Sequence, residues 1–233
     1  ISGIITGNNN YADGCGKTGL KGKAIGMQPA QDPVVEYANK LANRLIYCLT
    51  EKSVKVQTKY DYYNADNDTP DFGISTPMRM KHLRPGIGWA SRAVNTLGDR
   101  VVFEGFAKDT FGINDLLEQI NGYSVIGKST DDALIAGCSF IAVSDDGEGG
   151  KVLIPFTAQE ATGEVDQRTG MLKWGLAVTK WMIPKPRKPG IMYAPKDYIL
   201  FTPEFTAVFQ NRYLVEVVPN PTGRTLLHPI THR

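Results

Sequence analysis

The sequence predicts an α+β fold, in which a helical N-terminal half packs on a mostly antiparallel, β-rich C-terminal half. Before residue 137, apolar residues recur at helical spacing in several segments. After residue 137, short runs of β-branched and aromatic residues alternate with turn sequences. Helices that precede the strands, rather than alternating with them, are typical of the α+β class.

The first predicted helix begins at a strong start signal. Asp32 is a good N-cap, and Pro33 suits the first helical position because it has no N–H to leave unpaired. We expect this helix to end near Glu51, before a tyrosine-rich stretch at 54–63 and an acidic, turn-rich loop at 64–73. Its inward face consists of apolar residues at helical spacing: Val35, Ala38, Leu41, Ala42, Leu45 and Leu49.

Three shorter helices are predicted at 85–97, 113–121 and 129–136. Each is followed by a glycine, Gly98, Gly122 or Gly137, of the kind that commonly closes a helix. A strand is predicted at 101–106, directly after the first of these helices.

The predicted strands of the C-terminal half are separated by turn sequences such as the acidic, glycine-rich segment 145–150. We divide the chain into a flexible or non-native N-terminal segment (1–31), one α+β domain (32–225) and the start of a further connection (226–233). The predicted strands are 138–143, 151–155, 171–180, 198–202, 206–210 and 213–218.

Composition and charge restrict the function. The chain has 26 basic and 24 acidic residues and a net charge of +2. Proteins that bind nucleic acid by neutralising phosphates usually show a clear basic excess, so any contact with DNA must be local or loose. The apolar runs are shorter than the roughly 20 residues that a membrane span needs. The three cysteines form no CxxC pair, so the sequence has no zinc signature.

One segment invites an enzymatic reading. Gly14–Thr18 resembles the end of a phosphate-binding loop, with Lys17 and Thr18 as the nucleotide-binding side chains. That motif needs a glycine five residues before Gly16, where this sequence has Tyr11. A nucleotide-binding enzyme that uses residues 14–18 therefore stays an alternative, and a flexible glycine-rich tail is the favoured interpretation.

No catalytic, cofactor or metal site is predicted. The three histidines have no serine or cysteine nucleophile in a recognisable motif nearby. The candidate functional residues are instead possible contacts to subunits or partners. They comprise one tryptophan near the start of a helix and two basic clusters: Trp89, Arg79, Lys81, Arg84, Lys185, Arg187 and Lys188.

Three segments, in this order, resemble the portal proteins of tailed bacteriophages. The first is Asp61-Tyr62-Tyr63-Asn64, which follows the first helix. The second runs from Ile87-Gly88-Trp89-Ala90 through a helix that ends in Asp99-Arg100 and leads into a strand rich in Val, Phe and Gly. The third is the helix–Gly137–strand step of residues 132–143. The resemblance covers about residues 33–225, and none of it is a catalytic signature.

This resemblance implies a structural subunit, not an enzyme. Portal subunits form a ring, typically of twelve copies, at one capsid vertex, where terminase and later tail adaptors dock and double-stranded DNA passes without sequence-specific binding. The resemblance places residues 32–225 in a portal wing-like domain and 226–233 at the start of the connection to a missing stem and clip. It implies a location in the virion, and in the bacterial host cytoplasm during assembly. A capsid-associated binding module with a similar α+β core is a further alternative.

Overall fold

The structure is a computed structural model that describes residues 33–66, 88–145, 147, 150–182 and 194–231. Within these ranges the chain forms four helices followed by eight strands, which confirms the predicted α+β class. The helices are α1 (Pro33–Tyr63), α2 (Trp89–Gly98), α3 (Ile113–Gln119) and α4 (Gly122–Ala136). The strands are β1 (Cys138–Asp145), β2 (Lys151–Thr157), β3 (Ala161–Val165), β4 (Leu172–Trp181), β5 (Pro195–Phe201), β6 (Phe205–Gln210), β7 (Tyr213–Pro219) and β8 (Leu227–Thr231).

The strands form two antiparallel sheets. The larger sheet has the order β3-β4-β5-β6-β7, so each strand pairs with its neighbour in sequence. The smaller sheet has the order β2-β1-β8 and joins the first two strands to the last one. The two ends of the β-rich half therefore meet in the smaller sheet.

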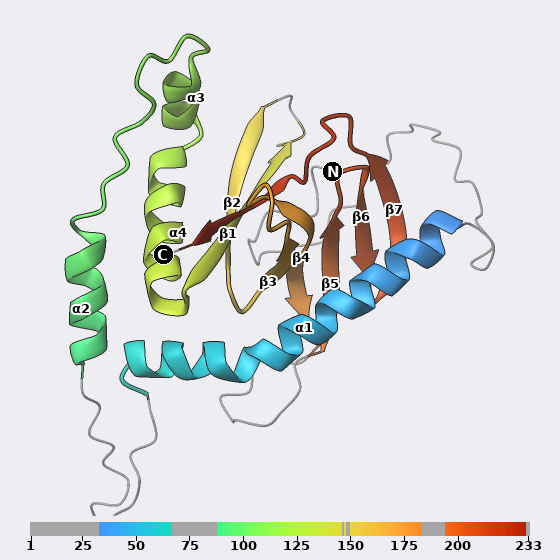
Figure 1. Cartoon of the computed structure of the whole chain (residues 1–233), viewed down its shortest axis with the longest axis horizontal. Coiled ribbons are helices and arrows are strands. Elements are labelled where there is room, and N and C mark those ends of the chain that lie inside the picture. Colours follow the sequence, from blue (N-terminus) through green and yellow to red (C-terminus); the bar gives the residue numbers. More distant parts are fainter. Residues whose placement is uncertain (1–32, 67–87, 146, 148–149, 183–193, 232–233) are drawn as a thin grey trace, which may run out of the picture.

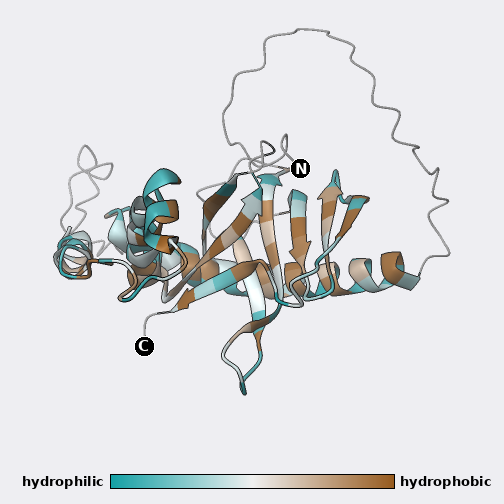
Figure 2. Ribbon diagram, turned by 90° about the horizontal axis from the view of Figure 1, so that it is seen from above, coloured by the Kyte–Doolittle hydropathy of each residue, from teal (hydrophilic) through white to brown (hydrophobic). Residues whose placement is uncertain are grey.

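Helix α1 covers one face of the larger sheet (Figure 1). The predicted apolar stripe of α1 is buried there, from Ala38 to Leu49. It packs against side chains from the central strands, including Leu176, Leu200 and Phe209, all of which are fully buried. In the view of Figure 2, apolar and polar residues alternate along the strands that lie over α1, as expected for a sheet with distinct faces.

The smaller sheet packs on the opposite face of the larger one. Phe140 and Ala142 of β1 and Leu227 of β8 contact Ile199 and Phe201 of β5. The larger sheet is therefore the middle layer of three, between α1 and the smaller sheet. We refer to these three layers as the sandwich.

The residues from Trp89 to Gln119 lie beside the sandwich. They comprise α2, an irregular segment and α3, and Figure 1 shows them at one end of the molecule, flanking α4. We call residues 89–119 the arm. Helix α4 connects the arm to the sandwich, since its last residues lead through Gly137 into β1. Gly137 has a φ of 93°, which makes it a left-handed C-terminal cap as its position predicts.

The six predicted strands of the C-terminal half are confirmed, with shifts of a few residues at their ends. Two further strands, β3 and β8, were not predicted. The β3 sequence Ala161–Val165 is short and contains a glycine, and β8 contains Pro229. Both features weaken a strand signal in sequence. Because β8 pairs with β1, the sheet extends past residue 225, where we expected the domain to end.

Three helix predictions need correction. Helix α1 does not end near Glu51 but continues to Tyr63. Its second half is held by polar contacts to other elements, which hydrophobic periodicity cannot show. Helix α3 ends at Gln119, and α4 begins at Gly122 rather than at Ser129, because Asn121 takes up a left-handed conformation that separates the two helices. The predicted helix 85–97 is observed from Trp89, and residues 85–87 lie outside the described ranges.

The predicted strand at 101–106 is wrong. These residues form no ladder with another strand, although Val101, Val102 and Phe103 favour strands in general. Their backbone is held instead by a side chain. Asn114 of α3 accepts a hydrogen bond from the Phe106 N–H at 2.8 Å and donates one to the Phe106 carbonyl at 2.9 Å.

Candidate functional site

The arm carries an unusual concentration of exposed apolar side chains. None of the residues of α2, all of which the structure describes, is buried. Trp89 is 80% exposed, Val102 71% and Phe111 88%. The exposed large apolar residues of this fully described stretch are Trp89, Leu97, Val101, Val102, Phe106, Phe111, Ile113 and Leu116. Such a set is typical of a surface that another molecule covers.

The segment from Phe106 to Asn114 forms a compact tip at the far end of the arm. The Asp109 carboxylate accepts hydrogen bonds from the N–H of Phe111 at 3.1 Å and of Asn114 at 2.6 Å. Together with the two Asn114 bonds to Phe106, these contacts fix the turn between the two phenylalanines. Phe103 adds edge-on packing against Phe106, with 5.5 Å between the ring centroids. The tip is thus ordered by contacts within the single chain.

Asp109 caps the start of α3 although it lies outside the helix. The backbone N–H groups of Asn114 and Ile113 hold the pKa of Asp109 below its ordinary value of 3.8. Because the pKa is lower in the folded state than in the unfolded state, the ionised carboxylate stabilises the fold above pH 3.8. This stabilisation is lost as the pH falls through the lowered pKa. At neutral pH Asp109 is therefore ionised and accepts these hydrogen bonds.

Gly105 is required by this geometry. Its φ is +107°, where side chains are strained, and a Cβ there would lie 2.7 Å from Asn114 Oδ1 and 3.0 Å from Tyr123 Oη. A larger residue at position 105 would displace the Asn114 side chain that holds Phe106. Gly105 was part of the segment that resembled portal proteins, and the structure assigns it this local role.

Polar contacts fix the base of the arm to the sandwich. The hydroxyl of Tyr63 on α1 donates a hydrogen bond to Asn95 Oδ1 on α2 at 2.9 Å. The Lys59 ammonium donates to the Ala136 carbonyl at the end of α4, at 2.6 Å. A lysine at a helix C-terminus also stabilises the negative end of the helix dipole. These contacts explain why α1 extends beyond the sheet.

Tyr60 and Asp132 form a second contact between α1 and α4. The Tyr60 hydroxyl lies 3.2 Å from Asp132 Oδ1. Burial raises the pKa of Asp132, although the hydrogen bond from Tyr60 opposes this change. Burial, followed by the charge of Asp132, also raises the pKa of Tyr60. The tyrosine therefore stays protonated and acts as the donor.

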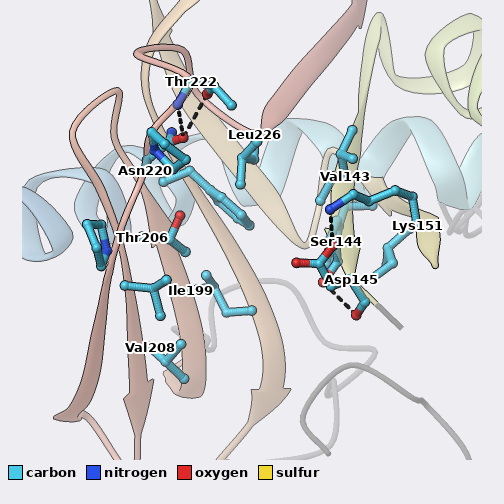
Figure 3. Close-up of a pocket in the computed structure, with 17 residues that line it drawn as sticks. Val143, Ser144, Asp145, Lys151, Ile199, Thr206, Val208, Asn220, Thr222 and Leu226 are labelled. Atoms are coloured by element: carbon cyan, nitrogen blue, oxygen red, sulfur yellow. Dashed lines mark hydrogen bonds and ion pairs between the residues drawn. The ribbon is translucent and has the colours of Figure 1, made fainter. Parts of the chain in front are cut away.

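A second feature lies between the two sheets. The smaller sheet does not cover all of the larger one, and an apolar pocket of about 240 Å³ remains over β5, β6 and β7. Figure 3 shows Ile199 and Val208 on the larger sheet facing this space, with Val143 of β1 and Leu226 across from them. A cavity of roughly 150 Å³ is enough to hold benzene, so this pocket has room for an aromatic side chain.

The polar groups at the rim of the pocket already have partners. Asp145 and Lys151 form an ion pair across the β1–β2 hairpin. Asn220 Oδ1 accepts hydrogen bonds from the N–H and hydroxyl of Thr222, at 3.1 and 2.7 Å (Figure 3). These bonds fix the shape of the rim. The lining favours an apolar guest.

Of the contact residues that the sequence predicted, Trp89 lies on the arm and is exposed. Its position leaves it free to act as a subunit contact, and it is not part of the core. The two basic clusters lie outside the described residues, as does the glycine-rich segment 14–18. The predicted residues in these parts are Arg79, Lys81, Arg84, Lys185, Arg187, Lys188, Lys17 and Thr18.

Neither the aromatic tip nor the pocket is predicted from the sequence. One signal for the tip was available, because Asp109 precedes the helix at 113 in the manner of a helix-start residue. The pocket had no such signal. Its lining comes from five strands and the segment after β7, which only the fold brings together.

Within the described residues, no three His, Cys, Asp or Glu side chains converge in a way that would hold a metal ion. No helix in the described part of the chain has the length and hydrophobicity that a membrane span requires.

No model of a known protein family matches the chain, and a search of curated proteins gave no match either.

Proposed function

We propose that this chain is the wing-region part of a tailed-bacteriophage portal protein, a structural subunit that acts by assembling into a ring. In this proposal the subunits, twelve in the typical case, surround a channel at one capsid vertex. Terminase and tail adaptors dock on the ring, and double-stranded DNA passes through it. The protein belongs to the virion, and to the bacterial cytoplasm during assembly.

The observation that carries the proposal is the exposed apolar surface of the arm. Aromatic side chains bury roughly 150–250 Å² each when they are fully covered. The exposed parts of Trp89, Phe106 and Phe111 therefore amount to about 400 Å². A standard interface buries about 800 Å² on each partner. The exposed aromatic area of the arm is therefore about half of what one partner contributes to a standard interface.

The position of the arm also supports a ring. A ring needs two different surfaces on each subunit, one for each neighbour. The arm lies at one end of the molecule and β7 at the opposite end (Figure 1). On β7, Tyr213 and Val215 are exposed and apolar. Apolar surfaces at opposite ends favour head-to-tail association over a two-fold dimer.

Electron microscopy of the purified gene product that contains this chain tests the proposal. We expect annular particles, and a sedimentation velocity profile dominated by one large species. A protein that stays monomeric at high concentration would contradict the proposal. Nucleotide binding that is lost on Lys17→Ala would favour the enzyme alternative instead.

A further inference from the structure

The inter-sheet pocket and the aromatic tip have complementary properties. The pocket is preformed and apolar, and its rim groups are hydrogen-bonded or ion-paired with one another. The tip presents Phe111, the most exposed of the large apolar side chains in the described residues, at 88%. Removing water from an exposed phenyl ring and from an apolar cavity of about 240 Å³ lowers the free energy of the system.

The two features cannot meet within one molecule. Phe111 lies directly before α3, at the outer end of the arm. The pocket lies over β6 and β7, and Figure 1 shows α4 and the smaller sheet between α3 and these strands. A phenylalanine at the tip can therefore fill only the pocket of another copy.

We infer that the Phe111 side chain of one copy inserts into the inter-sheet pocket of the next copy. This inference rests on the ring assembly proposed above and names the two surfaces that meet in it. The contact is heterologous, because the tip of one subunit meets a different surface of its neighbour. Each subunit then has one tip and one pocket to offer, and such contacts continue from copy to copy until a ring closes.

The area and the order of the tip support a second copy as the occupant. Covering the Phe111 ring buries about 200 Å², and the neighbouring Phe106 and Val102 extend the contact towards the 800 Å² of a standard interface. The hydrogen bonds of Asp109 and Asn114 hold the backbone that carries Phe111 before association. A segment whose backbone is already ordered loses less conformational entropy when it binds.

Three variants and one control test the contact through the concentration dependence of assembly. Phe111→Ala removes the ring, Asp109→Ala keeps the ring but releases the tip, and Thr206→Phe fills the pocket from within. We expect Phe111→Ala and Thr206→Phe each to weaken assembly at least tenfold, as for an interface hot spot, and Asp109→Ala to weaken it less. The control is Tyr47→Ala, which removes an aromatic side chain of α1 that is 68% exposed and touches neither surface. It should assemble like the wild type.

Cross-linking between copies tests the same contact directly. Chains carrying Phe111→Cys are mixed with chains carrying Thr206→Cys, both in a background in which Cys15, Cys48 and Cys138 are replaced by Ser, and oxidised. We expect a disulfide-linked heterodimer that is absent when Phe111→Cys is mixed with Tyr47→Cys or with the cysteine-free chain. Circular dichroism melting curves establish that each variant is folded. If Thr206→Phe does not fold, Phe111→Ala still tests the contact, because residue 111 is exposed and its replacement should not affect folding.

The outcomes separate this inference from the proposed function. If the wild type forms rings and Phe111→Ala assembles equally well without a specific cross-link, the tip–pocket contact is wrong and the ring stands. If the wild type does not assemble at all, the ring and the contact both fail.

Discussion

The sandwich and the arm use apolar residues in opposite ways. In the sandwich, residues such as Leu200 and Phe209 are fully buried between α1 and the two sheets. In the arm, Trp89 and Phe111 are as apolar but exposed, and the arm is held by the hydrogen bond from Tyr63 of α1 and by packing of Phe103 on Tyr123 of α4. An apolar residue of the sandwich therefore stabilises the fold by its burial, whereas an apolar residue of the arm stays exposed in the single chain and contributes little to the fold. Variants in the two regions should separate folding from assembly.

The largest expected effect comes from the centre of the sandwich. Phe209 is fully buried and stacks on Tyr198, with 4.6 Å between the ring centroids. Phe209→Ala should lower the free energy of unfolding by about 3–5 kcal/mol, because it leaves a cavity in a closed core. Urea denaturation followed by circular dichroism measures the change. A loss below about 1 kcal/mol would show that this core is as loosely packed as the arm.

An intermediate effect is expected where the two regions join. Asp132→Ala removes the acceptor for the Tyr60 hydroxyl and should lower the free energy of unfolding by about 1 kcal/mol. Asp132→Asn keeps an acceptor and removes a carboxylate whose burial is unfavourable. It should therefore be neutral or stabilising at pH 7. If Asn is as harmful as Ala in thermal denaturation, the charge of Asp132 matters more than its hydrogen bond.

A smaller effect on folding is expected in the arm itself. Trp89→Ala would cost about 3–5 kcal/mol if the side chain were buried. Since Trp89 is 80% exposed, the expected change in unfolding free energy is within about 0.5 kcal/mol. Melting curves of the dissociated protein check this, and sedimentation of the assembled protein should show weaker association. A large drop in melting temperature would show that Trp89 makes a core contact. The arm would then depend on buried apolar side chains in the same way as the sandwich.

The smallest effect concerns pH and the edge of the smaller sheet. Burial, and then the charge of Arg224, lower the pKa of His228 on β8 below 6.5. The unfolded state therefore binds a proton at a higher pH than the folded state, so stability rises with pH between the lowered pKa and 6.5. His228→Gln should flatten this dependence in a series of melting curves between pH 5 and 7. If stability rises equally steeply with pH in the variant, groups other than His228 cause the pH dependence.

The sequence analysis succeeded where a local pattern coincided with burial. The stripe from Ala38 to Leu49 predicted both the first half of α1 and the face that it buries. It failed where contacts from distant residues decided the structure. Residues 101–106 have strand-forming side chains, but the Asn114 amide holds the Phe106 backbone and no neighbouring strand pairs with it. Likewise, Pro229 weakened the signal of β8, which forms because β1 offers it an open edge.

The residues of the candidate site also divide into those that a local pattern predicts and those that only the fold brings together. The sequence singled out Trp89, and the structure places it on the exposed arm. Phe111 and the pocket were not predicted. A single exposed phenylalanine has no periodicity that would distinguish it from a buried one, and the pocket is lined by residues up to 84 positions apart, from Ala142 to Leu226.

By itself, the sequence determined the α+β class, the buried stripe of the first helix and most strands of the C-terminal half. These features depend on residue spacing and turn chemistry, which act over a few residues. Only the tertiary structure decided how the strands divide into two sheets, why the narrower sheet leaves a pocket, and which apolar residues remain exposed. Those outcomes depend on which surfaces meet in space, because burial is a property of the assembled layers and not of any one segment.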